Sequence, residues 1–499
     1  MPEFSLNDLK DIQGLILSGY AHLRYGAYLF LHFKDQARAT AWLKKIIPMV
    51  TTSERWEALP GGGKKKPDVT TNLALTYPGL KAIGLPEETL FSFTREFIWG
   101  MAQRSHNLGD CDESAPEKWE LGGPSTEEVH ALVYLNAIDE AALDKLRETH
   151  RALLKESAGG VIEINEQHGH RPPSDKEHFG FHDGIAQPKI QRMPGYPDDV
   201  RNVVATGEFI LGYQNEFQGG MKPPSPWMLP EHDPASVLRP FEPEDKDLQG
   251  KKNFGLHGTY LVYRKLAQDV AGFWNYLADK ARRGEAGSPD TQDIVYLASK
   301  SVGRWPSGAP LALSPEKDDP ELGRDAGRND RFLYFKQDRD GYACPIGSHI
   351  RRCNPRDSRY LEEDKEFALA SSDKHRIIRR AVSFGPELFP RDDVEQGKIP
   401  ANLQDDGQER GLHFFGLNAN IRSQFEFLQQ TWCNNGVFDG LYENKDPLIG
   451  DNDGTGDMVI PRKPVRRLLS NFPRFVKTRG GAYFFVPSMT ALRYLADGG

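Results

Sequence analysis

Residues Gly26–Phe33 read GAYLFLHF, and Asp35–Val50 read DQARATAWLKKIIPMV directly after them. The first stretch is short and rich in aromatic and aliphatic residues, which favours a buried β-strand. The second places apolar residues at three- and four-residue spacing, the period of an amphipathic helix. The two stretches therefore predict a strand followed by a helix that packs against a sheet.

The same strand–helix pattern recurs along the chain. The further pairs are Val129–Asn136 with Asp139–His150, Gly258–Tyr263 with Ala267–Ala281, Gly411–Leu417 with Ile421–Trp432, and Gly481–Val486 with Met489–Leu495. The spacing between the pairs is too wide and too irregular for a tandem repeat array. The pattern predicts an α+β fold with two domains, each an antiparallel sheet covered on one side by helices.

A stretch rich in proline and charge separates the two halves. It covers residues 219–252 (GGMKPPSPWMLPEHDPASVLRPFEPEDKDLQGKK) and shows no clear periodicity. We therefore predict an N-terminal domain over residues 1–218, a connection over 219–252 and a C-terminal domain over 253–499.

Composition excludes several classes of protein. The 499 residues carry 63 Lys and Arg against 71 Asp and Glu, a net charge of −8. Binding to nucleic acid or to an anionic membrane surface needs a basic face, so neither partner is expected. The longest apolar runs fall far short of the roughly 20 residues that cross a bilayer.

Cysteine usage and the N-terminus indicate the compartment. The four cysteines are Cys111, Cys344, Cys353 and Cys433. None forms a CxxC pair, so the spacing predicts neither a zinc ribbon nor a redox dithiol, and four thiols are too sparse for a disulfide scaffold. The first residues, MPEFS, show neither a basic nor an apolar leader region, and we expect a cytoplasmic protein.

Two segments depart from the strand–helix pattern. Phe179–Pro188 (FGFHDGIAQP) brackets Asp183 with glycines, which lets the backbone and a carboxylate approach a flat ligand. An Asp-Gly turn with a self-capping Asp is the ordinary alternative. Cys344–Arg356 (CPIGSHIRRCNPR) places one His before three Arg, which suits a site for anionic groups such as phosphates or haem propionates.

These residue types suit one chemistry. A haem iron takes a single axial imidazole and leaves its other face open. Peroxide activation on that face needs a base that moves a proton between the two oxygens, and a cation that stabilises the leaving oxygen. One His, one Asp and one Arg, far apart in sequence, are enough for this reaction.

Motifs of one family occur in family order from residue 11 to about 487. They are Asp11–Leu17 (DIQGLIL), Gly180–Gly184 (GFHDG, matching GxxDG), His349–Arg356 (HIRRCNPR), Ile377–Gly385 (IIRRAVSFG), Gly411–Phe414 (GLHF) and Gln424–Phe427 (QFEF). The chain therefore resembles the dye-decolorizing peroxidases, and its length resembles their long bacterial branch. The resemblance implies two ferredoxin-like domains of the dimeric α+β barrel type, with the GxxDG loop near the end of the first and the haem in the C-terminal half.

The resemblance also implies a role for each site residue. His349 would be the proximal iron ligand, Asp183 the distal acid–base group and Arg379 the distal arginine, also in contact with the haem. The other cofactor-binding residues would be Arg356, at a haem propionate, and Leu412 and Phe414, at the wall of the distal pocket. For the second ring nitrogen of His349 we consider Glu426 or a nearby Asp as acceptor.

The expected activity is that of a peroxidase with haem b (iron protoporphyrin IX). Hydrogen peroxide would oxidise the haem to a ferryl intermediate, which then oxidises dyes, phenolic compounds and other bulky donors. An unperturbed Asp has a pKa of about 3.9, so an Asp base predicts an acidic optimum. The acidic run Glu362-Glu363-Asp364 is a further hypothesis, as a manganese site near a propionate.

Two alternatives remain at this point. A non-enzymatic haem-binding or iron-release protein can share the same fold, although a passive carrier needs only His349 and neither Asp183 nor Arg379. A non-haem metal site is the other, because carboxylates and imidazoles gather between residues 168 and 183. The candidate ligands are His168, His170, His178 and His182, with Asp175 and Asp183.

Overall fold

The strands of the first half form an antiparallel sheet with the connectivity of a ferredoxin-like unit. The structure, a computed structural model, describes residues 3–54, 66–193, 202–217, 221–281, 291–358 and 365–497. The strands are β1 (Tyr25–Phe33), β2 (Val69–Leu75), β3 (Ala131–Ala137) and β4 (Val161–His170), in the order β2-β3-β1-β4. Helices α3 (Gln36–Ile46) and α8 (Glu140–Glu156) follow β1 and β3, which completes the β-α-β-β-α-β sequence.

The second half repeats this connectivity with longer insertions. Its strands are β9 (Thr259–Gln268), β10 (Ile378–Arg379), β11 (Val382–Phe384), β12 (Gly411–Asn418) and β15 (Val476–Val486). Their order is β10-β12-β9-β15, and β11 pairs with β12. Helix α9 (Val270–Ala281) follows β9, and two π-helical segments, η8 (Arg422–Glu426) and η9 (Leu428–Cys433), follow β12.

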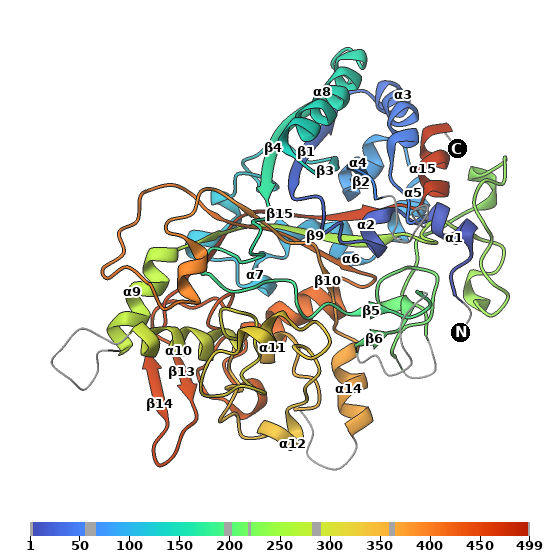
Figure 1. Ribbon diagram of the computed structural model, residues 1–499. Helices are drawn as coiled ribbons and strands as arrows, with labels where there is room; N and C mark the ends of the chain where they lie inside the picture. The colour runs from blue at the N-terminus through green and yellow to red at the C-terminus, as the bar shows by residue number, and fades with distance from the viewer. Residues whose placement is uncertain are drawn as a thin grey trace, which may run out of the picture.

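The remaining elements are short or lie outside the two units. The other helices are α1 (Leu6–Asp11), α2 (Gly14–Leu17), α4 (Tyr77–Ala82), α5 (Glu87–Phe91), α6 (Arg95–Gln103), α7 (Ser105–Leu108), α10 (Thr291–Val302), α11 (Pro320–Arg324), α12 (Phe335–Asp338), α13 (His349–Cys353), α14 (Lys365–Asp373) and α15 (Met489–Asp497). The other strands are β5 (Lys189–Ile190), β6 (Val203–Val204), β7 (Trp227–Met228), β8 (Lys252–Asn253), β13 (Asp457–Ile460) and β14 (Arg467–Ser470). In Figure 1, β9 and β15 cross the middle of the molecule, with α3 and α8 on one side and α9 and α10 on the other.

The two sheets join through a single residue pair. Phe485 of β15 pairs with Leu75 of β2, and this makes one nine-stranded sheet. The hydrogen-bonded strands follow one another from β10 at one edge of the sheet to β4 at the other. Within the described residues these two edges do not pair, so the sheet does not close into a barrel. At its ends, β4 and β11 still touch, since a Cβ on Gly169 would lie 2.5 Å from Cγ1 of Val382.

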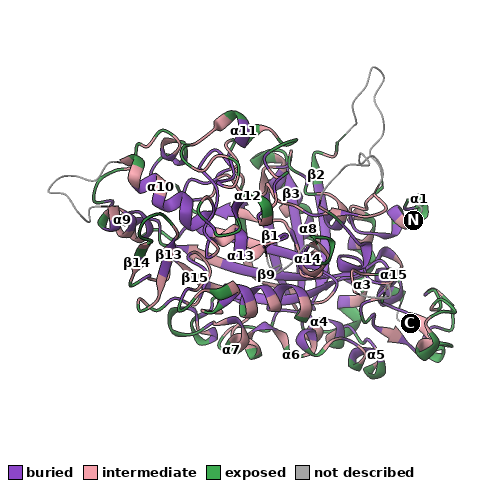
Figure 2. Cartoon of the chain, turned by 90° about the horizontal axis from the view of Figure 1, so that it is seen from below, coloured by how far each residue is buried: buried purple, intermediate pink, exposed green. Residues whose placement is uncertain are grey.

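All the predicted strand–helix pairs are present, and the α+β prediction is confirmed. The reason lies in the packing of strands such as β1. Its Ala27 and Leu29 pack in the core beneath the helices, whereas Tyr28 and Phe30 pack in the core between the two sheets. Both faces are buried, so the strand reads as a continuous apolar run. Figure 2 shows β1, β9 and β15 as buried along most of their length.

The N-terminal motif Asp11–Leu17 forms hydrogen bonds to both halves of the chain where their sheets meet. Gln13 is fully buried, and its Nε2 donates to Leu73 O of β2 at 2.8 Å and to Pro487 O after β15 at 2.9 Å. Asp11 accepts from Thr490 N, at the start of α15, at 2.7 Å. The motif near residue 11 is therefore structural, and it ties the two ends of the chain together.

Residues 221–252 contain β7 and two short 3₁₀ turns, Pro230–His232 and Lys246–Leu248. The strands of the two units fall on either side of this segment, while α15 returns to pack on α3 of the first half. The division into 1–218, 219–252 and 253–499 stays a prediction. No helix in the described part of the chain has the length and apolar character to cross a membrane.

Candidate functional site

A cavity lies on the face of the second sheet opposite the core between the two sheets, because Arg264 and Phe414 line it whereas the neighbouring Tyr263 and Phe415 pack in that core. Its sheet wall consists of Arg264, Leu266 and Gln268 of β9, Leu412 and Phe414 of β12, and Val476 and Thr478 of β15. Leu412 pairs with Leu266 and Phe414 with Arg264, so these side chains share one face of adjacent strands. The loop that carries Asp183, the helix that begins at His349 and the strand that carries Arg379 also contribute to the lining. The predicted distal and proximal residues therefore face one cavity.

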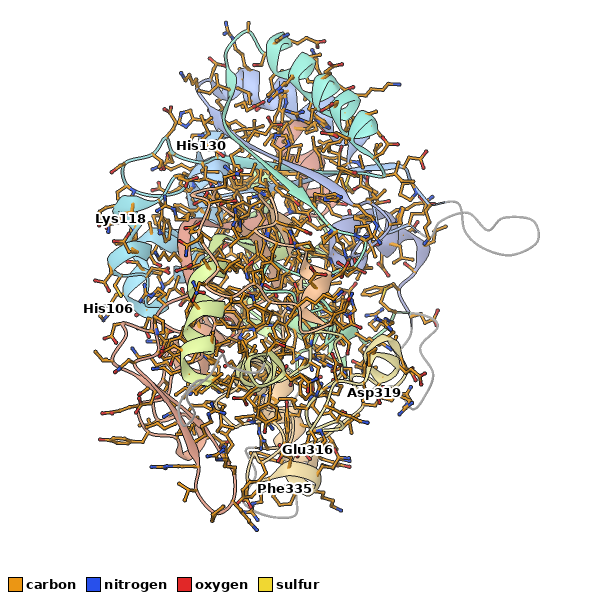
Figure 3. All side chains as sticks on the ribbon, turned by 60° about the vertical axis from the view of Figure 1, so that its left-hand side comes forward. His106, Lys118, His130, Glu316, Asp319 and Phe335 are labelled. Atoms are coloured by element: carbon orange, nitrogen blue, oxygen red, sulfur yellow. The ribbon has the colours of Figure 1, made fainter. Side chains whose placement is uncertain are left out.

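The chain reaches the proximal side after a long excursion. Between α10 and α13 it forms a small core of its own, which includes Trp305, Phe332 and Tyr334. Figure 3 shows Glu316, Asp319 and Phe335 of this segment in the lower part of the molecule. The chain then returns through Ser348, the N-cap of α13, which is fully buried. This places His349 at the first position of a short helix beneath the cavity.

His349 is held by a buried carboxylate. Its Nδ1 lies 2.9 Å from Oδ2 of Asp446, whose Oδ1 accepts from the backbone N–H groups of Leu448 and Ile449 at 2.8 and 2.9 Å. Burial disfavours the charged imidazole, but the Asp446 carboxylate outweighs it and raises the pKa of His349 well above its ordinary value. With Nδ1 occupied, Nε2 is the nitrogen left for a metal, and a carboxylate behind the ring increases its basicity.

Glu426, the other acceptor that we considered, is not the partner of His349. It accepts from Nε of Arg104 at 2.8 Å and from the Tyr483 hydroxyl at 2.9 Å. Those contacts use both carboxylate oxygens, because Arg104 donates to the second oxygen as well. Asp446 lies in an irregular loop 97 residues from His349, where no sequence spacing indicates it.

Asp183 and Arg379 form an ion pair on the opposite side. Nη1 of Arg379 donates to Oδ1 of Asp183 at 2.8 Å, and the N–H of Gly184 donates to the same oxygen at 2.6 Å. Burial favours the neutral carboxyl, but the guanidinium outweighs it and lowers the pKa of Asp183 below its usual value. Asp183 is therefore ionised over an acidic range in which a His base would be protonated.

The side chain of Gln187 holds the backbone of β10 at Arg379 and so positions the ion pair. Gln187 accepts from the N–H of Arg379 at 3.0 Å and donates to its carbonyl at 3.3 Å. The neighbouring Arg380 points elsewhere, because its guanidinium donates to the carbonyls of Leu15 and Ile16, each at 3.1 Å. Of the two adjacent arginines, Arg379 is the one that lines the cavity with Asp183.

The GxxDG loop has its shape because of two glycines and a half-buried Glu. Gly180 has φ +91°, and a Cβ there would lie 2.4 Å from Cγ2 of Val394, so a larger residue would clash. Gly184 has φ +82°, a conformation that L side chains rarely adopt. Glu177 accepts from the N–H groups of Phe179 and Phe181 at 2.8 and 3.0 Å. No motif indicated Glu177, although it stands only three residues before Gly180.

Arg356 is not among the residues that line this cavity, and its expected role at a propionate stays a prediction. Its guanidinium donates to the carbonyls of Asp330 and Phe332 at 2.9 and 3.1 Å and pairs with the Asp330 carboxylate. It also stacks on the Phe332 ring, 3.9 Å from its centroid. Three of its N–H donors are thus used within the 330–356 segment.

Other buried donors at the cavity wall lack a protein partner. Among the described residues these are Nη2 of Arg376, Nε and Nη1 of Arg264, and Nδ2 of Asn354. A buried donor without a partner is costly, so such groups indicate a missing acceptor. An apolar cavity with an imidazole and unpartnered cationic donors in its wall fits a flat ligand with carboxylates, which is the chemistry of haem.

A second, more polar cavity adjoins the first. It shares Asp183, Arg379 and Leu412 with the first cavity, and its outer part is lined by cationic and polar side chains. Among these are Arg24, Arg171, Asp175 and Lys189. Asp183 and Arg379 thus stand between a polar cavity and an apolar one.

The non-haem metal site proposed between residues 168 and 183 does not form. His168 pairs with Glu166 at 3.3 Å, and the His170 ring packs on Tyr25 with centroids 4.6 Å apart. His178 lies 2.7 Å from Phe384 O. Within the described residues, the one group of His, Cys, Asp or Glu at metal-ligand distances is His349, Cys353 and Asp446.

Comparisons with known proteins agree with this geometry. Residues 11–172 match the family model described as the DyP dimeric alpha+beta barrel domain. A dye-decolorizing peroxidase of Exidia glandulosa is 30% identical over 98% of this chain and 87% of the relative. The crystal structure of a decolorizing peroxidase from Auricularia auricula-judae superposes with a TM-score of 0.74 at 27% identity, covering 98% of this chain and 99% of that one. A dye-decolorizing peroxidase in complex with 2,6-dimethoxyphenol also matches, with a TM-score of 0.74 at 25% identity over 98% of this chain and 99% of that one.

Proposed function

This chain belongs to the dye-decolorizing peroxidase family and is a peroxidase, and from that premise we propose how its own residues carry out the reaction. We propose haem b in the apolar cavity, with Nε2 of His349 toward the iron. The supporting observation is that one cavity joins an imidazole backed by Asp446 to the Asp183–Arg379 pair. When bound, the haem supplies the redox centre that takes two oxidising equivalents from peroxide.

Asp183 moves the proton in this proposal. As a carboxylate it accepts a proton from one oxygen of hydrogen peroxide and returns it to the other oxygen, which leaves as water. Arg379 keeps the carboxylate ionised and directs its N–H groups toward the oxygen on which negative charge develops. The adjoining polar cavity is the proposed route by which peroxide reaches this pair.

Replacing Arg379 with Leu is expected to slow the reaction with peroxide by about 10²–10³-fold, the loss typical of one preorganised donor. It is also expected to move the acidic limb of the pH–rate profile to higher pH. The guanidinium lowers the pKa of Asp183, the base works only above that pKa, and removing the cation raises it. Stopped-flow rates between pH 3 and 7 check both effects.

Arg380→Leu is the matched control, since its guanidinium contacts the carbonyls of Leu15 and Ile16 and not Asp183. We expect it to lower the melting temperature and to leave the pH profile in place. The assignment of the two arginines would be reversed if the acidic limb of the pH–rate profile moved in Arg380→Leu and stayed in place in Arg379→Leu.

We propose that Arg376 and Asn354, rather than Arg356, hold a haem propionate. Both have a donor that lacks a protein partner and line the cavity. Replacing Arg376 with Met is expected to increase the rate of haem transfer to an excess of a haem-scavenging protein by about 10-fold or more, as one lost charge-assisted hydrogen bond implies.

Arg356→Met is the comparison for that measurement. It is expected to destabilise the fold, because it leaves the Asp330 carboxylate without this partner, yet to keep haem transfer near the wild-type rate. Faster haem transfer from Arg356→Met than from Arg376→Met would return the propionate role to Arg356. Arg376→Gln provides a second variant should the Met variant fold poorly.

Phenolic compounds and dyes are the proposed donors, as the neighbour with 2,6-dimethoxyphenol supports for phenols. The test is the absorption spectrum of the purified holoenzyme before and after one equivalent of hydrogen peroxide, followed by steady-state oxidation of 2,6-dimethoxyphenol and an anthraquinone dye. A haem band without donor oxidation would favour the passive haem-binding or iron-release alternative. Manganese stays a hypothesis, because Glu362-Glu363-Asp364 lie outside the described residues.

A further inference from the structure

Two thiols meet beside the proximal histidine. Cys353 is the last residue of α13, one helical turn after His349, and Cys433 is the last residue of η9. Their Sγ atoms are 3.8 Å apart, although the residues are separated by 80 positions in the sequence. Sγ of Cys353 is also 3.8 Å from Nδ1 of His349, and both cysteines line the haem cavity.

We propose that Cys353 and Cys433 are a reversible redox pair that forms a disulfide when peroxide exceeds the supply of electron donors. The inference rests on the peroxidase function, because that function brings the oxidant to this cavity. It reverses an expectation from sequence, where the absence of a CxxC motif indicated no redox dithiol.

The step balances with hydrogen peroxide alone. The Cys353 sulfur attacks one peroxide oxygen, the O–O bond breaks, and a sulfenic acid and one water result. The Cys433 sulfur then attacks the sulfenic sulfur, an S–S bond replaces the S–O bond, and a second water leaves. Overall, two thiols lose two electrons and two protons while one peroxide becomes two waters. A cellular dithiol can reverse the step by thiol–disulfide exchange.

The separation of the two sulfurs is small enough for the proposed bond. A disulfide needs sulfurs about 2.05 Å apart, so the two atoms have to approach by about 1.8 Å, within reach of side-chain rotation at the ends of two short helices. Both cysteines line the cavity, but Cys353 is half-buried and Cys433 is buried, which makes Cys353 the thiol that peroxide reaches first.

The other two cysteines serve as internal controls. Cys344 is buried with its sulfur against Ser348 Oγ at 3.2 Å and Tyr334 OH at 3.8 Å. Cys111 is exposed and lies 3.4 Å from Nη2 of Arg474. Neither of these contacts offers a second thiol for a cross-link.

The test uses haem-loaded Cys111→Ser protein, which removes the exposed thiol and with it cross-links between molecules. The protein is treated with hydrogen peroxide without donor, alkylated, and digested without reduction for mass spectrometry. We expect the free thiols to fall from three to one, with the peptides of Cys353 and Cys433 joined. Dithiothreitol should restore three thiols. In Cys111→Ser/Cys344→Ser protein the same cross-link should form, whereas Cys111→Ser/Cys433→Ser protein should retain a sulfenic acid at Cys353 that dimedone traps.

Persistence of three thiols after peroxide treatment, or sulfinic acid at Cys353 without a cross-link, would overturn the proposal and leave the pair as small packing residues. Dye oxidation by the same preparation is measured in parallel. Active enzyme without the cross-link refutes the redox pair alone, whereas protein that binds haem but does not oxidise donors refutes the peroxidase premise.

Discussion

Asp183→Asn enzyme is expected to react with hydrogen peroxide about 10²–10⁴-fold more slowly than the native enzyme, the range of general acid–base catalysis. The amide keeps the size of the carboxylate and can still accept from Gly184 N–H, but it cannot take up a proton. Haem should stay bound, because the expected iron ligand, His349, lies on another element of the cavity. The measurement is the pseudo-first-order rate of the haem absorbance change against peroxide concentration.

Asp175→Asn is the matched control for that experiment. Asp175 is a nearby carboxylate that accepts from Arg171 at 2.7 Å and lines the polar cavity but not the apolar one. We expect its rate to stay within a few-fold of the native rate. A full-rate Asp183→Asn enzyme would remove the carboxylate from the mechanism and leave Arg379 as the main distal group.

The second large effect is expected for His349→Ala, which should lose most of its bound haem. The imidazole is the proposed iron ligand, and Ala offers no donor atom in its place. The ratio of haem to protein after gel filtration, with the absorbance spectrum, measures the loss. Imidazole added to the His349→Ala protein should restore haem binding, since the deleted ring leaves a space of its own shape next to Asp446.

His182→Ala tests the other imidazole in the cavity. His182 and His349 are the two histidines in its described lining. Burial lowers the pKa of His182, and no carboxylate is hydrogen-bonded to its ring nitrogens among the described contacts, in contrast to His349. Retention of haem by His182→Ala with loss from His349→Ala supports the proximal assignment, and the opposite result would transfer it to His182.

The sequence predicted the strands that are buried on both faces, and it missed strands that are not apolar throughout. β4 lies at the end of the sheet, is partly exposed along most of its length and reads VIEINEQHGH, so no apolar run marks it. β2 is buried but carries Thr70, Thr71 and Asn72. Those polar residues have distant partners, such as Gln13 Oε1, which accepts from Asn72 Nδ2 at 3.2 Å. Polar residues can stand in this buried strand because residues elsewhere in the chain supply their hydrogen-bond partners.

The candidate site likewise contains residues that the motifs indicated and a residue that they did not. The family motifs indicated Asp183, His349 and Arg379, and the structure brings all three to one cavity. Asp446 was missed because its contact with His349 spans 97 residues. The contacts of Arg356 with Asp330 and Phe332 were not foreseen, because a motif shows that a guanidinium is present but not which carbonyls occupy its donors. Its backbone adopts φ +53°, and its N–H groups are taken up by residues 330 and 332.

The amino-acid sequence by itself determined the class of fold, the order of the strand–helix units and the family, because periodicity and short motifs are local properties of the chain. Only the tertiary structure decided which acceptor stands behind His349, which arginine reaches Asp183 and which thiols touch. Those outcomes depend on where distant elements pack: β10 beside β12 directs Arg379 to the distal side, and α13 against η9 brings Cys353 to Cys433. A side chain acts on what lies within a few ångströms of it, and that neighbourhood is set by long-range packing rather than by sequence distance.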